Sequence, residues 1–85
     1  MRITSQTIAK ALTQEQDELA VNKETKAWAI VEGTMHGSKV SLELETHSDD
    51  KISLRYNGHF AVSVSTELRM EVIVSVIKSL LPQQN

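Results

Sequence analysis

The sequence contains no cysteine, which excludes disulfide bonds and thiolate metal sites and leaves the apolar core to supply the stability. It has three glycines, too few for a phosphate-binding loop, and we expect each of them at a bulge or a turn. Trp28, Tyr56 and Phe60 are the only aromatic residues, so stacking platforms for bases or sugars are scarce.

Positively and negatively charged residues are nearly equal in number. Nine basic and eleven acidic residues give a formal net charge of -2, which matches neither a typical nucleic-acid binder nor an acidic DNA mimic. The apolar C-terminal stretch falls short of the ~20 residues of a membrane span and is interrupted by charged residues. We therefore expect residues 1–85 to form one soluble, cytoplasmic domain, too small to enclose a deep enzymatic pocket.

Residues 65–81 carry more apolar surface than any other stretch. Placed on a helix, their apolar side chains span roughly 240°, which is wider than the stripe of a one-sided surface helix. We predict a helix capped by Ser65 or Thr66 and stopped by Pro82, with a fifth strand as the alternative because many of these residues are β-branched. The helix then keeps an uncovered flank at Met70, Val74 and Leu81.

Residues 4–20 predict a first helix with Thr4 as its N-cap. Its larger apolar residues form one narrow stripe, made of Ile8, Leu12 and Leu19. A break at Thr13 into two shorter helices is the alternative, since Thr13 also opens a capping-box pattern. The polar residues 21–24 are predicted to be a linker.

After residue 26 the apolar period changes from that of a helix to the period of two that is typical of strands. Four strands are predicted, joined as an antiparallel meander, and their inward residues include Val40, Leu42, Leu44, Ile52, Leu54, Phe60, Val62 and Val64. A three-residue loop at 56–58 is favoured over a two-residue turn at Asn57 and Gly58, because it sets Leu54 opposite Phe60.

The first predicted strand, residues 26–34, is apolar on both faces. If residues 35–37 form a three-residue loop, Trp28 and Ile30 face the core. The open face then carries Ala27, Ala29 and Val31. A slip of one residue exchanges the two sets, and the sequence leaves both registers open.

The histidines His36, His47 and His59 are the obvious candidate bases or metal ligands, and all three fall on predicted turns or solvent-facing positions. Their spacing matches no zinc signature, and His47 with Asp49 and Asp50 is interpreted as a polar turn rather than a metal site. No serine lies in a nucleophile-elbow pattern. We predict that the protein is not an enzyme and uses no metal or cofactor.

The predicted fold is α+β: an N-terminal helix, a four-stranded antiparallel meander and a long C-terminal helix, with both helices on one sheet face. The surplus apolar residues predict a small protein-binding module, an inhibitor, adaptor or regulator of the size that bacteria and phages encode. We expect a homodimer that uses the helix flank and the first strand, through Met70, Val74, Leu81, Ala27, Ala29 and Val31. A plain monomer is the alternative, if the N-terminal helix covers that flank.

Nucleic-acid binding is the alternative from a different class. It would use the solvent-facing side of the sheet, through Lys39, Lys51 and Arg55. Glu43 and Glu45 alternate with these residues and oppose binding to a phosphate backbone.

Overall fold

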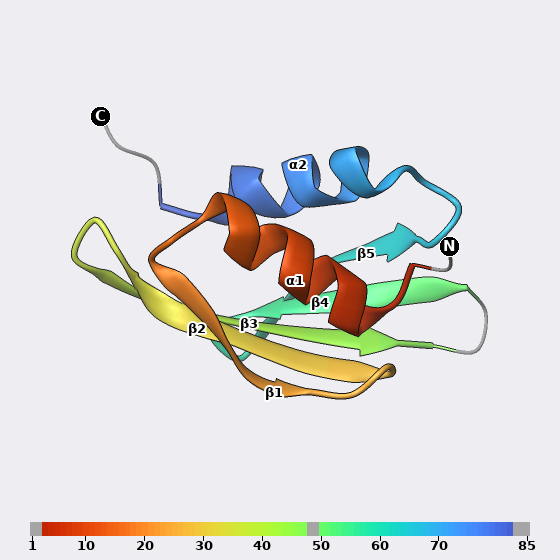
Figure 1. Ribbon diagram of the computed structural model, residues 1–85, viewed down its shortest axis with the longest axis horizontal. Helices are drawn as coiled ribbons and strands as arrows, with labels where there is room; N and C mark the ends of the chain where they lie inside the picture. Colours follow the sequence, from red (N-terminus) through yellow and green to blue (C-terminus); the bar gives the residue numbers. More distant parts are fainter. Residues whose placement is uncertain (1–2, 48–49, 83–85) are drawn as a thin grey trace.

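The computed structural model describes residues 3–47 and 50–82, which form an α+β fold (Figure 1). Along the chain, a first helix is followed by the five strands of an antiparallel sheet and then by a second helix. The elements in chain order are α1 (Ser5–Glu15), β1 (Leu19–Glu24), β2 (Trp28–Met35), β3 (Ser38–Thr46), β4 (Lys51–Tyr56), β5 (His59–Ser65) and α2 (Met70–Leu80). The strands follow one another across the sheet, so the predicted meander is confirmed. Its predicted strand count of four is wrong.

The two helices lie on the same side of the sheet in Figure 1. α1 contacts β1, β2 and β3, and α2 lies beside α1. Neither α1 nor α2 combines the length and the hydropathy of a membrane-spanning helix, and the described residues contain no other candidate.

The additional strand, β1, begins where the first helix was predicted to continue. α1 ends at Glu15, and Leu19 pairs with Gly33 of β2, which places the Leu19 side chain in the core at 4% exposure. The predicted linker at residues 21–24 is therefore part of a strand. The alternative break at Thr13 is also wrong, because the Thr13 hydroxyl donates to the Ala9 carbonyl within an unbroken helix.

The start of α1 agrees with the prediction that Thr4 caps it. Thr4 and Thr7 form a reciprocal capping box, in which each side chain accepts a hydrogen bond from the other residue's backbone N–H. The next residue, Ser5, is fully buried, and its hydroxyl lies 2.6 Å from that of Thr46. This contact ties the first turn of α1 to the end of β3.

The core lies between the sheet and the helices. Five predicted inward residues of β3 and β4 are at most 2% exposed: Val40, Leu42, Leu44, Ile52 and Leu54. Val62 and Val64 of β5 are half-buried and pack against this core. Strict alternation of apolar and polar residues therefore identified the core side of β3 and β4 correctly.

The turn between β4 and β5 corrects the predicted loop. Asn57 and Gly58 have φ values of 51° and 87°, as a two-residue type I′ turn requires. Arg55 pairs with Phe60 while Leu54 pairs with Val62, so Ala61 is an extra, bulged residue. The bulge returns the later β5 residues to the core side and leaves Phe60 on the opposite face, 64% exposed. The predicted inward position of Phe60 is wrong.

This placement predicts that Phe60→Ala changes the stability little. An exposed substitution of this kind is expected to shift the free energy of unfolding by about 0.5 kcal/mol or less, whereas a buried phenylalanine would lose about 3–5 kcal/mol. Urea denaturation measures the difference, and a loss above about 2 kcal/mol would place Phe60 in the core after all.

The β2–β3 turn has the same two-residue form, with φ of 50° at His36 and 83° at Gly37. It pairs Val31 with Leu42 and Ala29 with Leu44, which is the slipped register. Ala29 and Val31 are consequently fully buried, and the prediction that they lie on the open face is wrong. Ala27 precedes β2 and is exposed.

α2 is a helix, but it begins at Met70 and not at residue 65. Ser65 ends β5, and the Thr66 backbone N–H and hydroxyl both donate to the Asp50 carbonyl. Of the predicted uncovered flank, Met70 is half-buried against the core, Val74 is 3% exposed and Leu81 is 4% exposed. That prediction is wrong because this flank of the helix belongs to the core.

Candidate protein-interaction surface

A row of exposed apolar side chains runs along α2 on a different flank. Leu68, Val72 and Leu80 are 40%, 42% and 37% exposed, and half-buried Val76 fills the gap between the last two. Residues four apart on a helix lie on one flank, with a drift of about 40° per step. On α2, Val72, Val76 and Leu80 therefore make one apolar row, and exposed Leu68 lies in the turn just before the helix.

The row faces away from α1. The Lys78 ammonium lies 3.0 Å from the Glu15 carboxylate of α1, which marks the side of α2 that faces α1. On a helix, Val72 and Val76 fall on the other side of the buried residues from Lys78. Because α1 contacts β1 to β3, the side of α2 away from α1 is the side toward β5.

β5 ends the described sheet, so one side of its backbone faces no neighbouring strand in the described residues. Exposed edges in proteins are commonly protected by charged side chains. The other edge, β1, carries Lys23 and Glu24, whereas residues 59–66 contain no lysine, arginine, aspartate or glutamate. We define the β5–α2 surface by its apolar residues, which are Val62, Val64, Leu68, Val72, Val76 and Leu80.

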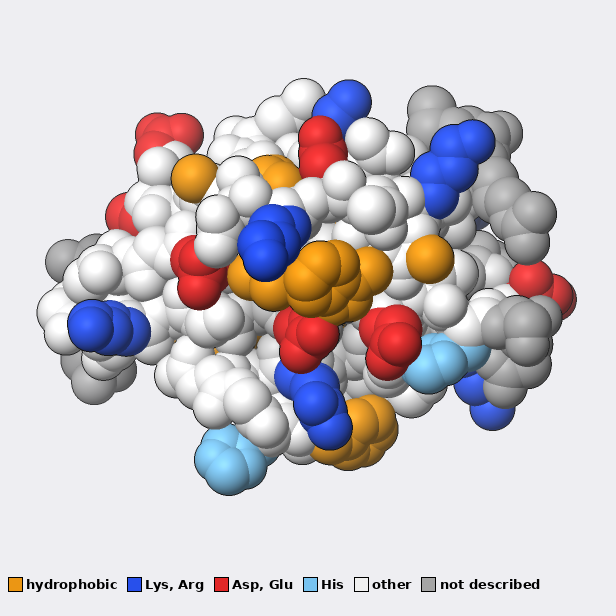
Figure 2. Space-filling model, turned by 90° about the horizontal axis from the view of Figure 1, so that it is seen from below, with side chains coloured by type: hydrophobic (Ala, Val, Ile, Leu, Met, Phe, Trp, Pro, Cys, Tyr) orange, Lys and Arg blue, Asp and Glu red, His pale blue; other side chains and the backbone are white. Residues whose placement is uncertain are grey.

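The face of the sheet away from the helices carries a second apolar patch (Figure 2). Trp28 and Ile30 of β2 are half-buried there. The Trp28 indole N–H donates to the Glu43 carboxylate at 2.6 Å, and the Lys23 ammonium lies 5.8 Å from the centre of the Trp28 ring. Charged groups of both signs thus border this patch, and the indole N–H of its tryptophan already has a hydrogen-bond acceptor within the chain.

The same open face holds the residues of the predicted nucleic-acid site. Lys39, Lys51 and Arg55 alternate with the core residues of β3 and β4, as predicted, but Lys39 and Lys51 lie near opposite ends of the sheet. Arg55 pairs directly with Glu43, and Glu45 lies two residues along the same face. The three cations are therefore separated by carboxylates and do not form one basic patch.

This distribution predicts weak nucleic-acid binding. Fluorescence anisotropy with single- and double-stranded DNA and with RNA should show no saturable binding at low salt and micromolar protein. Affinity that falls steeply with salt concentration, as several phosphate contacts require, would instead support the nucleic-acid alternative.

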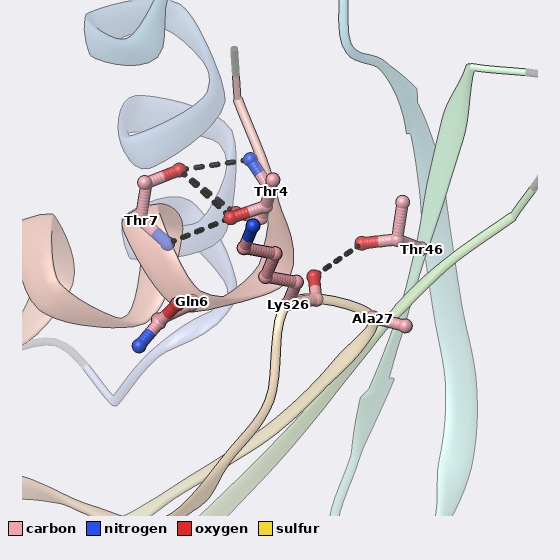
Figure 3. A pocket seen from close by; sticks show the side chains of 6 residues that line it. All are labelled: Thr4, Gln6, Thr7, Lys26, Ala27 and Thr46. Atoms are coloured by element: carbon pink, nitrogen blue, oxygen red, sulfur yellow. Dashed lines mark hydrogen bonds between the residues drawn. The ribbon is translucent and has the colours of Figure 1, made fainter. Parts of the chain in front are cut away.

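A shallow open hollow of about 440 Å³ lies beside the start of α1 (Figure 3). It is lined by Thr4, Gln6, Thr7, Lys26, Ala27 and Thr46. Thr4 and Thr7 are committed to the capping box, and the Thr46 hydroxyl donates to the Lys26 carbonyl at 3.4 Å. Lys26 is the one ionisable side chain in this lining, so the hollow offers no acid–base pair for catalysis.

The histidines lie apart. His36 is in the β2–β3 turn, His59 opens β5, and the His47 imidazole lies 2.7 Å from the Ser53 hydroxyl. Within residues 3–47 and 50–82, no group of three or more histidine, cysteine, aspartate or glutamate side chains could hold a metal ion. Asp49 of the considered His47 site lies outside the described residues.

Comparison of the chain with protein-family models, with curated proteins and with solved structures finds no match. Sequence reasoning found the excess of apolar residues on α2 but assigned the exposed flank to the wrong residues. The four-residue spacing of Val72, Val76 and Leu80 was the available signal.

Proposed function

We propose that this protein is a small, non-enzymatic protein-binding domain whose contact site is the β5–α2 surface. The observation that carries the proposal is a set of apolar side chains, each more than a third exposed, beside an uncharged edge strand: Val72 and Leu80 on α2 and Leu68 in the turn before it. Contiguous apolar patches are uncommon on proteins that remain alone in water, because each Å² kept from water is worth about 25 cal/mol. A partner that covers the row recovers this free energy.

The two layers of the surface support two kinds of contact. The edge of β5 offers backbone groups that can pair with a strand, and the α2 row offers side chains that can pack against a helix or a loop. An inhibitor, adaptor or regulator works through such contacts and needs no catalytic group. The absence of cysteine suits the reducing cytoplasm, where we place this activity.

A retention experiment tests the proposal. Immobilised wild-type protein should retain a protein partner from the host lysate or from added copies of its own chain, and Val72→Glu should reduce that retention about tenfold or more. Ser75→Glu is the matched control, because Ser75 is exposed on the same helix but lies outside the apolar row.

Two results would contradict the proposal. One is equal retention by wild type and Val72→Glu. The other is the failure of the wild-type protein to retain either a lysate protein or its own chain.

A further inference from the structure

We infer that the partner of the β5–α2 surface is a second copy of this chain, joined by antiparallel pairing of β5 with β5 about a twofold axis. The inference rests on the proposed function and specifies the partner for the same surface. In this arrangement the two sheets become one continuous sheet, and the two α2 rows meet above the new junction.

The charge of the surface favours self-association. A twofold axis sets each surface against a copy of itself, so a charge near the axis faces a like charge and is destabilising. Residues 59–66 and the apolar row contain no lysine, arginine, aspartate or glutamate. Glu67, Arg69 and Glu71 border the row, and Arg69 and Glu71 lie 3.4 Å apart as an ion pair. The strand edge and the row themselves therefore carry no charge that would repel their own copy. At the β1 edge, Lys23 and Glu24 make pairing less favourable.

The layers also fit a twofold arrangement. β5 is the edge strand and α2 lies above it in Figure 1, so one belongs to the sheet layer and the other to the helix layer. The Lys78–Glu15 contact places the apolar row on the flank of α2 away from α1. A rotation that makes the two β5 strands antiparallel also makes the two α2 helices antiparallel. One twofold rotation therefore both pairs the two β5 strands and packs the two apolar rows against each other.

The register follows from the bulge at Ala61. Residues directly opposite each other in an antiparallel pair share one face of the sheet. β5 is regular from Val62 to Ser65, and Val62 and Val64 both face the core side. An axis through Ser63 sets Val62 opposite Val64 of the second copy and keeps all four valines on the helix side.

A stable dimer through this surface has to bury an area of ordinary interface size. An interface of ordinary size buries about 800 Å² from each partner, which is about 15% of the 5384 Å² accessible surface of this chain. β5 and α2 have 7 and 11 residues, about a fifth of the 85 in the chain, and their outward sides form the surface.

The molecular mass in solution is the first test. Sedimentation velocity at tens of micromolar should give about 19 kDa, twice the 9.5 kDa of the chain. Val72→Glu combined with Leu80→Glu should give 9.5 kDa with an unchanged circular dichroism spectrum, and Ser75→Glu should remain dimeric. A wild-type mass of 9.5 kDa at this concentration overturns the inference. Retention of a different protein by the β5–α2 surface would still support the proposed function.

Cross-linking tests the arrangement itself, because the chain has no cysteine of its own. Ser63→Cys should form a covalent dimer under mild oxidation, since opposite residues across an antiparallel pair have Cα atoms about 4.5–5.5 Å apart, within the range of a disulfide. Ala20→Cys, exposed on the β1 edge, should remain uncross-linked. A dimer that cross-links through Ala20→Cys and not through Ser63→Cys overturns the β5 arrangement.

Discussion

Replacing Val74 by glutamate is expected to remove most of the folding stability of this domain. The Val74 side chain is 3% exposed and belongs to the core cluster, so a carboxylate there would lie among apolar groups. An uncompensated buried charge costs about 3–5 kcal/mol or more, and a domain of this size has about 4–13 kcal/mol in total. Thermal unfolding followed by circular dichroism measures the loss.

Val72→Glu is the matched control. It makes the same substitution two positions earlier, where the side chain is 42% exposed. At protein concentrations low enough for the chain to be monomeric, it should change the free energy of unfolding by less than about 1 kcal/mol. If Val74→Glu melts as cooperatively and at the same temperature as Val72→Glu, the assignment of the two flanks of α2 is wrong.

Gly33→Ala is expected to destabilise the protein for a different reason. Gly33 lies inside β2, not at the bulge or turn that its sequence suggests, and its backbone needs no positive φ. A Cβ atom there would overlap the backbone carbonyl oxygen of Glu18 and approach the Leu19 side chain. The chain enters β1 from α1 at this point, so the backbone would have to move.

We expect Gly33→Ala to cost about 2–3 kcal/mol, as overpacking of an interior does, and to lower the melting temperature by about 10–20 °C. Thr34→Ala is the control, because Thr34 is the exposed neighbour on the same strand and should change the stability by less than about 0.5 kcal/mol. Similar melting temperatures for the two variants would show that β1 does not approach Gly33 closely.

The parts of the fold that follow from local pattern were predicted correctly. β3 and β4 each alternate apolar and polar residues without interruption, and only one face of such a strand can enter the core. β1 was missed because Leu19 fits two periods at once: it is in phase with Leu12 on a helix and with Val21 on a strand. Pairing with β2 decides between them, and that contact is not local.

The registers of the two hairpins were missed for a related reason. A two-residue turn at Asn57 and Gly58 sets the apolar faces of β4 and β5 out of step, so the sequence argued against it. The structure keeps that turn and restores the alignment with the bulge at Ala61. No residue pattern near Ala61 predicts the bulge, and Phe60 was assigned to the core as a result.

The sequence predicted an exposed apolar flank on the last helix, but it did not predict which residues form that flank. The apolar arc of the last helix is too wide for one covering layer, which indicates an exposed flank. Which flank remains exposed depends on where α1 lies, and the contact between Glu15 and Lys78 joins residues 63 positions apart. The position of α1 beside α2 cannot be predicted from the pattern of apolar residues alone.

Hydrogen–deuterium exchange of the backbone amides at high and low protein concentration shows whether β5 pairs with a second copy of the chain. If β5 pairs with a second copy, amides of residues 62–65 should exchange more slowly at tens of micromolar than after dilution to nanomolar concentration. The amides of β1, on the opposite edge, should exchange at the same rate under both conditions. Exchange in β5 that is independent of concentration, or protection confined to β1, would contradict the account.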